Sequence, residues 1–194
     1  MKSERPPVIG ITGTPGTGKK STGRIVADLL GYRFLELNRV AFETGSVLDR
    51  REDDFEVDPK RLRRNILKRI EGGGIVLSGH LLPYILKRGE VDFVAVLRCS
   101  PEDLEKRYVG RGYSDVKVRE NVASEILDIC LGDALKQFGA DAVAEFDTTG
   151  QRAVDVAKEI VAVFQGSKQR SIGQVRWLSS DQSAAEHLID RYLK

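Results

Sequence analysis

The sequence GTPGTGKKST, residues 13–22, lies between an apolar run at residues 8–11 and a segment with helically spaced apolar residues that ends before Gly31. The run predicts a buried strand, and the segment predicts a helix. A turn with Gly, four residues, Gly and Lys that joins a strand to a helix is typical of a loop that binds phosphate groups. Its backbone N–H groups and the positive end of the helix can both face an anion. The alternative, a tight turn with a surface lysine, explains the spacing less well.

Gly13, Gly18 and Lys19 fit this loop pattern, but the next position is unusual. A Ser or Thr usually follows the lysine and binds magnesium through its hydroxyl, whereas this chain has Lys20 there and Ser21 one residue later. A charged ammonium has no lone pair, so Lys20 cannot coordinate a metal. We predict that Lys20 binds phosphate as a second cation. The alternative is a side chain turned to solvent, with only the backbone N–H near the phosphates. The sequence leaves the residues that bind magnesium unknown.

The length and composition of the chain limit what it can be. With 194 residues it is long enough for one domain with a sizeable core. Its formal net charge is only +2, from 31 basic and 29 acidic residues, which gives little support for nucleic-acid binding, and we do not expect DNA as a partner. No apolar run reaches the length of a membrane span, and the first residues, MKSERPPVIGIT, do not resemble a signal peptide. Cys99 and Cys130 are too few for a disulfide framework, so we expect free thiols, a cytoplasmic location and no membrane partner.

Strand and helix patterns alternate along the chain. Apolar runs that predict further strands lie at residues 33–37, 72–79, 91–99 and 141–149. Helical patterns lie at residues 58–72, 100–110, 114–138 and 151–166, and residues 184–193 predict a terminal helix. Strands that alternate with helices in this way predict an α/β fold with a central parallel sheet flanked by helices.

The turn GRGYS, residues 110–114, lies between two predicted helices; Arg107 precedes it and Arg111 lies within it. Ser114 and Asp115 are suited to cap the helix that follows. An enzyme that transfers phosphoryl groups must exclude water and neutralise charge around the reacting group, often with a mobile segment. A short glycine-containing turn with an arginine suits that lid role. A simple connecting turn with solvated arginines is the alternative.

Several stretches, in the same order along the chain, resemble one archaeal family. They are GITGTPGTGKKST, GGGIVLSGHL, VAVLRCSPEDLEKR, RGYSDVKVRENVASEILD and EFDTTGQ, and VRWLSS near the end is similar as well. The family is that of the archaeal putative adenylate kinases, homologous to the eukaryotic coilin-interacting nuclear ATPase protein, also called adenylate kinase isoenzyme six. The resemblance implies the P-loop nucleoside monophosphate kinase fold. It divides the chain into a kinase domain at 1–166, with a monophosphate-binding arm at about 36–57 and a short lid at about 110–120, and a tail at 167–194.

The same resemblance implies an activity. Members of the family transfer the terminal phosphoryl group of ATP to AMP, often accept other nucleoside monophosphates, and hydrolyse ATP weakly, with Mg²⁺ as cofactor. They are linked to maturation of the small ribosomal subunit through a ribosomal protein of that subunit. A pre-ribosomal particle is therefore an expected partner.

The resemblance also implies which residues form the site. Carried onto this chain, the ATP site consists of Gly16, Gly18, Lys19, Lys20 and Ser21, with Arg111 from the lid. The implied catalytic residues are Lys19, His80 and Arg111. A histidine directly after a strand is also commonly a structural hydrogen bonder, so that alternative stays open for His80.

The chain departs from the family pattern at three positions. Lys20 replaces the usual hydroxyl residue, and Ser78 stands where eukaryotic members have an acidic residue that organises the water around magnesium. Phe42 stands where an arginine that contacts the acceptor phosphate is expected. The candidates to replace that arginine are Arg39, Arg50, Arg51 and Arg88.

Three functions are compatible with these features. The first is a nucleoside monophosphate kinase with AMP as acceptor. The second is an ATP-hydrolysing ribosome-assembly factor in which transfer to a monophosphate is incidental, and the departures at Ser78 and Phe42 favour it slightly. The third is a kinase for another small acceptor, such as a nucleoside or a coenzyme precursor, because P-loop folds host many reactions.

Overall fold

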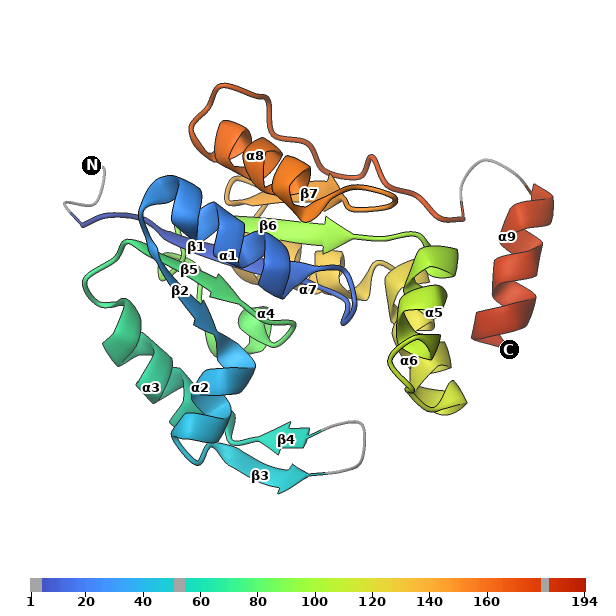
Figure 1. Ribbon diagram of the computed structural model, residues 1–194, viewed down its shortest axis with the longest axis horizontal. Helices are drawn as coiled ribbons and strands as arrows, with labels where there is room; N and C mark the ends of the chain where they lie inside the picture. The colour runs from blue at the N-terminus through green and yellow to red at the C-terminus, as the bar shows by residue number, and fades with distance from the viewer. Residues whose placement is uncertain (1–4, 51–54, 179–181) are drawn as a thin grey trace.

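Five parallel strands form the central sheet in the order β2-β5-β1-β6-β7, which confirms the predicted α/β fold (Figure 1). The computed structural model describes residues 5–50, 55–178 and 182–194. The strands of this sheet are β1 (Val8–Gly13), β2 (Arg33–Glu36), β5 (Ile75–Ser78), β6 (Phe93–Arg98) and β7 (Val143–Asp147). Every residue of β1, β5 and β6 is buried, because helices cover both faces of the sheet.

Helices pack on the two faces of the sheet. One face is covered by α1 (Lys19–Leu30) and α8 (Ala153–Phe164). The other is covered by α2 (Leu37–Glu43), α3 (Pro59–Ile70), α4 (Leu82–Ile85) and α7 (Ile129–Phe138). Successive strand residues point to opposite faces, so Val8 of β1 packs with the second group of helices and Ile9 with the first.

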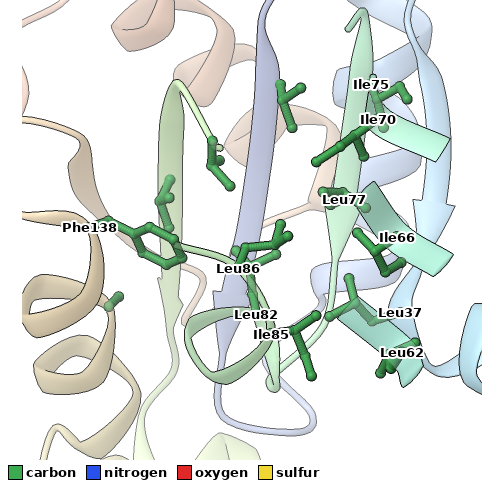
Figure 2. Packing of buried hydrophobic residues seen from close by; sticks show 14 of the residues in the cluster. Leu37, Leu62, Ile66, Ile70, Ile75, Leu77, Leu82, Ile85, Leu86 and Phe138 are labelled. Atoms are coloured by element: carbon green, nitrogen blue, oxygen red, sulfur yellow. The ribbon is translucent and has the colours of Figure 1, made fainter. Parts of the chain in front are cut away.

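Figure 2 shows the packing of α3 on the second face. Leu62, Ile66 and Ile70 recur every four residues, so they lie on one side of the helix and pack with Ile75 and Leu77 of β5. Burial of each such side chain contributes roughly 1.5–3 kcal/mol. This packing fixes the start of α3, and therefore the segment that precedes it, against the sheet.

A third group of helices lies beyond the carboxyl ends of the strands (Figure 1). It contains α5 (Pro101–Val109), α6 (Asp115–Ile126), α9 (Gln182–Leu188) and the π-helical turn η1 (Ile189–Leu193). Leu104 and Tyr108 of α5 pack there with Val122 of α6 and with Leu188 and Tyr192 of the C-terminal segment. None of the helices in the described ranges combines the length and hydrophobicity that crossing a bilayer requires.

The segment between β2 and α3 contains elements that the apolar pattern did not reveal. After α2 the chain forms an antiparallel hairpin of β3 (Val47–Arg50) and β4 (Phe55–Val57), which lies outside the central sheet (Figure 1). Asp58 then caps α3 by accepting a hydrogen bond from the Arg61 N–H at 3.0 Å, and Pro59 occupies the first turn. Helix α2 and the hairpin together form a projecting unit of the chain.

The prediction of one continuous helix at residues 114–138 is wrong. Ser114 does cap the helix as expected, accepting from the Lys117 N–H at 3.4 Å, but α6 ends at Ile126 and α7 begins at Ile129. Between them Asp128 has a positive φ of 56°, a conformation that aspartate tolerates better than most residues. In this position its carboxylate accepts a hydrogen bond from Arg98. The apolar spacing continues across the break, so periodicity alone could not reveal it.

Arg98, the last residue of β6, is the centre of a buried ion cluster. Its side chain is 1% exposed, and its Nε lies 2.7 Å from Glu125 Oε1 of α6. Its Nη1 lies 2.6 Å from Glu145 Oε1 of β7, and its Nη2 binds the Asp128 carboxylate. One guanidinium thus joins the sheet to α6 and to the junction between α6 and α7.

The C-terminal segment covers this cluster. The Trp177 indole N–H donates to Glu125 Oε1 at 3.2 Å, and the indole ring lies 5.9 Å from the Arg98 guanidinium carbon. The Gln174 backbone N–H donates to Glu145 Oε2 at 3.0 Å. These contacts hold the segment after α8 against the carboxyl ends of β6 and β7.

We expect Arg98→Met to lower the free energy of unfolding by about 3–5 kcal/mol, because it leaves Glu125 and Glu145 buried without their cation. Urea denaturation followed by circular dichroism measures the change. The control is Arg152→Met, since Arg152 pairs with Asp155 at 2.7 Å but its side chain is 79% exposed. The control should unfold close to the wild type. Equal effects of the two substitutions would contradict the importance of the cluster.

Candidate functional site

The glycine-rich loop lies between β1 and α1, where the sequence places it. Gly13, Gly16 and Gly18 have φ values of 135°, 88° and 92°, which glycine adopts without steric cost. A Cβ atom on Gly13 would lie 2.2 Å from the Leu97 carbonyl oxygen, so any other residue would force β1 away from β6. The loop therefore turns sharply into the first turn of α1, and Gly18 is the N-cap.

Lys19 begins α1 and folds back over the loop. Its Nζ donates to the Thr14 carbonyl oxygen at 2.8 Å. Burial lowers the pKa of Lys19 from 10.5 to about 8, although the neighbouring Cys130 and Glu125 act in the opposite direction. The Lys19 ammonium therefore loses its proton more easily than an exposed lysine does. A phosphate oxygen bound nearby would stabilise its positive charge.

A cavity of about 400 Å³ opens beside the loop, and we call it the phosphate cavity. Its lining brings together all the residues that the sequence analysis placed in the ATP and catalytic sites: Gly16, Gly18, Lys19, Lys20, Ser21, His80 and Arg111. Three other lining residues, Glu36, Ser78 and Gly79, come from the carboxyl ends of β2 and β5. Open α/β sheets bind their ligands at this edge.

The Lys20 side chain is directed toward β2. Its Nζ lies 2.9 Å from Glu36 Oε2, and the side chain is 63% exposed. The sequence analysis missed Glu36. A signal was present, because Glu36 is a carboxylate near the end of a predicted strand. Ligands of open α/β sheets bind at the carboxyl ends of the strands.

The last turns of α5 support the loop from the other side. Arg107 Nη1 donates to the Gly16 carbonyl oxygen at 3.0 Å, and the Tyr108 hydroxyl donates to the Pro15 carbonyl oxygen. Arg111 follows three residues later and lines the phosphate cavity. The sequence analysis noted Arg107 only as a flanking residue of the lid turn, whereas the structure bonds it to the loop itself.

A second cavity, of about 540 Å³, adjoins the first, and we call it the acceptor cavity. It is walled by α2, the β3–β4 hairpin, α4, α6 and α7. Phe42 and Phe55 pack there with ring centroids 5.0 Å apart, and the Arg50 guanidinium carbon lies 5.8 Å from the centre of the Phe42 ring. Lys117 and Asn121 face the cavity from one side of α6.

Two polar atoms in this wall have no hydrogen-bond partner among the described residues. They are Asn121 Nδ2 and Asn38 Oδ1, and both atoms are buried. Asn121 as a residue is only 8% exposed. Buried amide groups in folded proteins are nearly always hydrogen-bonded, so each of these atoms has the capacity for a further polar partner.

The four arginines suggested as replacements at the Phe42 position have different surroundings. Arg50 lines the acceptor cavity. Arg39 pairs with Glu43 at 2.6 Å, and Arg88 pairs with Asp141 at 2.9 Å, both with exposed arginine side chains. Neither Arg39 nor Arg88 lines either cavity, so these two suggestions are not supported. Arg51 lies outside the described residues.

The donors in the phosphate cavity suit a magnesium ion that arrives with a nucleotide. They are the Ser21 and Ser78 hydroxyls and the Glu36 carboxylate. Within the described parts of the chain, no group of three or more His, Cys, Asp or Glu side chains could hold a metal ion by itself. Magnesium commonly keeps several waters and binds through phosphate oxygens and one or two carboxylates, which these donors fit.

Comparison with known proteins gives related sequences and a shared fold. Residues 9–128 match the family model described as "AAA domain". Proteins named "Putative adenylate kinase" are similar over most of their length. The protein of that name from Thermococcus onnurineus is 31% identical, over 94% of this chain and 97% of its own length. The one from Pyrococcus furiosus is 36% identical, over 88% of this chain and 91% of its own length. The protein of the same name from Archaeoglobus fulgidus is 33% identical over 94% and 98%.

Solved structures show the same fold at lower identity. Shikimate kinase from Acinetobacter baumannii, in complex with shikimate, superposes with a TM-score of 0.56 at 20% identity, covering 86% of this chain and 97% of its own. A gluconokinase from Sinorhizobium meliloti 1021 has a TM-score of 0.54 at 18% identity, covering 85% and 95%. The fold of this chain is therefore that of the P-loop kinases.

The pKa of Lys19 leads to a prediction about pH. Below about pH 8 the side chain is charged and can bind a phosphate directly, whereas above it the protein must take up a proton when a nucleotide binds. We expect the affinity for ADP to be constant near neutral pH and to fall by up to about tenfold per pH unit above pH 8. Isothermal titration calorimetry at a series of pH values measures this.

Lys19→Arg is the control for this pH profile. An arginine stays charged throughout the range, so this variant should bind ADP more weakly but with a flat profile. A wild-type affinity that stays constant well above pH 8 would contradict the depressed pKa.

Proposed function

This chain belongs to the archaeal family of proteins named "Putative adenylate kinase". We propose that it is a nucleoside monophosphate kinase, which transfers the γ-phosphoryl group of ATP to AMP and gives two molecules of ADP. Family and fold together make it a phosphotransferase. One observation supports the proposal most strongly: Pro15, Asn38, His80 and Tyr113 line both cavities. A donor in one cavity and an acceptor in the other would meet at these four residues, as direct transfer requires.

On the donor side, we assign ATP to the phosphate cavity. The backbone N–H groups of the loop and Lys19 would hold its phosphates, with Lys20 and Ser21 beside them. Arg111 would neutralise charge that develops on the transferred group. Mg²⁺, when bound with ATP, would supply further charge neutralisation between the phosphate oxygens.

On the acceptor side, we assign AMP to the acceptor cavity. Arg50 and Lys117 are cations that could bind its phosphate, and Asn121 Nδ2, which has no partner among the described residues, could donate to the nucleoside. Phe42 and Phe55 offer an aromatic surface for a base. His80, at the boundary between the cavities, would contact the reacting phosphates. A small apolar acceptor would leave Asn121 Nδ2 without a hydrogen-bond partner, so this lining favours a polar acceptor.

The domain assignment follows from the same proposal. Residues 1–166 would be the kinase domain, with α2 and the β3–β4 hairpin as the monophosphate-binding arm at about 36–57. The turn and start of α6 at about 110–120 would be the lid. The tail, 167–194, would serve as the support that holds the Arg98 cluster through Trp177.

In a second candidate function the protein also binds ATP, but it hydrolyses the nucleotide, and transfer of the phosphoryl group to an acceptor is incidental. We propose, from the resemblance to the coilin-interacting nuclear ATPase protein, weak ATP hydrolysis and a role in maturation of the small ribosomal subunit in the cytoplasm. The supporting observation is that Trp177 of the tail binds Glu125, which also accepts from the Thr14 hydroxyl of the loop at 2.5 Å. A partner that binds the tail and moves Trp177 would thus shift Glu125, and with it the Thr14 end of the loop. Nucleotide-dependent co-sedimentation with small-subunit precursors would distinguish this role.

The main test is an acceptor screen. The purified protein is incubated with Mg·ATP and each nucleoside monophosphate, and ADP formation is measured by a coupled assay. We expect AMP to raise the rate well above that with ATP alone, and other monophosphates to do so less. If no nucleotide acceptor raises the rate, the kinase proposal is wrong, and a panel of other small acceptors becomes the next test.

Arg50 gives a sharper prediction about the acceptor. Arg50→Met should raise the KM for AMP by about tenfold or more and leave the KM for ATP unchanged, because a charge-assisted bond to the acceptor phosphate is lost. Steady-state kinetics with each substrate varied in turn measures both constants. Arg39→Met is the matched control, because Arg39 lies on the same arm but pairs with Glu43 outside the cavity. Similar KM values for AMP in the two variants would contradict the assignment.

A further inference from the structure

Glu36 is the only carboxylate among the described residues that line the phosphate cavity. We propose that Glu36 orients the water ligands of the magnesium ion that accompanies the nucleotide, and that Lys20 is the counter-ion of this carboxylate. The inference rests on the proposed function, in that it takes the phosphate cavity to bind a nucleotide with its magnesium. It makes Glu36 a positioning residue, because the carboxylate would act through water and not on the reacting atoms.

The position of Glu36 in the sheet supports this role. β2 and β5 are parallel neighbours, and Glu36 is the register partner of Ser78, with both at the carboxyl ends of their strands. Ser78 is 2% exposed, and its short hydroxyl carries no charge. Glu36 has a longer side chain that is 24% exposed and reaches the same cavity from the adjacent strand. The negative charge that a hydrated magnesium ion favours is therefore present at this edge, one strand away from Ser78.

Lys20 explains why a carboxylate is tolerated there. A carboxylate beside nucleotide phosphates repels them unless a cation lies between. The Lys20 ammonium lies 2.9 Å from Glu36 Oε2 and presents positive charge and N–H donors. The water shell of magnesium would present the same two features, positive charge and hydrogen donors, to the same oxygen. Because the Lys20 side chain is 63% exposed, its ammonium can move aside at little cost.

Lys20 also removes a direct magnesium ligand from the loop, and this makes a nearby carboxylate more important for binding the ion. It occupies the position at which a hydroxyl usually binds magnesium directly, and a charged ammonium cannot do so. Support for the ion would then come from phosphate oxygens and from groups that hold its water. Ser21 and Ser78 can accept or donate hydrogen bonds there, but of the lining residues that the structure describes only Glu36 adds negative charge.

The test compares nucleotide binding with and without magnesium, so it needs no phosphoryl transfer. The affinity for ADP is measured by calorimetry in Mg²⁺ and in EDTA, and their ratio gives the magnesium enhancement. We expect Glu36→Gln to reduce this enhancement about tenfold, in line with the effect of removing a group that orients a metal's ligands, and to leave the affinity in EDTA equal or slightly higher. The electron paramagnetic resonance spectrum of Mn²⁺ bound with ADP should change as well.

Two further variants make the experiment specific. Glu43→Gln removes a carboxylate on α2 that pairs with Arg39 outside the cavity, and should keep the wild-type enhancement. Glu36→Gln combined with Ser78→Asp returns a carboxylate to the register partner and should recover most of the enhancement. The proposal is wrong if Glu36→Gln leaves both the enhancement and the Mn²⁺ spectrum unchanged, or if it alters affinity equally in Mg²⁺ and in EDTA. A failed acceptor screen would not affect this result, because ADP binding does not require an acceptor.

Discussion

The buried guanidinium of Arg98 is the constraint on which the site depends. It binds Glu125, Glu145 and Asp128, and Glu125 also accepts a hydrogen bond from the Thr14 hydroxyl of the loop. Three carboxylates around one cation leave excess negative charge, so a further cation nearby is favourable. Lys19 is close enough for Glu125 to raise its pKa against the effect of burial. The loop lysine therefore belongs to the same electrostatic group that joins α6, β6 and β7.

The loop is also held from the side of α5, and this decides which way its backbone dipoles point. The carbonyl oxygens of Pro15 and Gly16 accept hydrogen bonds from Tyr108 and Arg107. Because C=O and N–H point in opposite directions across one peptide, the fixed Pro15 carbonyl directs the Gly16 N–H away from α5, and an N–H free in this way can bind an anion. The Thr17 N–H, in contrast, donates to the Thr14 carbonyl oxygen at 3.3 Å. Positive charge in the cavity thus comes from backbone geometry as well as from side chains. Changes at Arg107 or Tyr108 would disturb this geometry without touching a ligand.

Local sequence patterns predicted those parts of the structure that are determined by residues close together in the sequence. The strand, glycine turn and helix around Lys19 follow from composition and spacing within about twenty residues, and the structure has them there. The break at Asp128 could not be predicted, because its cause is a bond to Arg98, 30 residues away in sequence. Asn121 was missed for a similar reason, because its significance depends on which cavity it adjoins, and spacing does not encode that. Glu36 did carry a signal at the end of a predicted strand, but its position beside Ser78 depends on the strand order, which spacing does not encode.

On the proposed function, Arg50 of the hairpin would compensate for the departure from the family pattern at Phe42. Its ring packs on Phe55 and lies beneath Arg50, so an aromatic residue on α2 positions a cation that belongs to the hairpin. Glu36 and Ser78 show the same relation between two strands of the sheet, with the carboxylate on β2 and the short hydroxyl on β5. In both cases a charged side chain lines a cavity beside an uncharged residue of another element, so on the proposed function the charge would be supplied from a different place in the chain. Electrostatic stabilisation depends on where the charge lies more than on which element carries it, so a site can keep its chemistry while individual motif positions change.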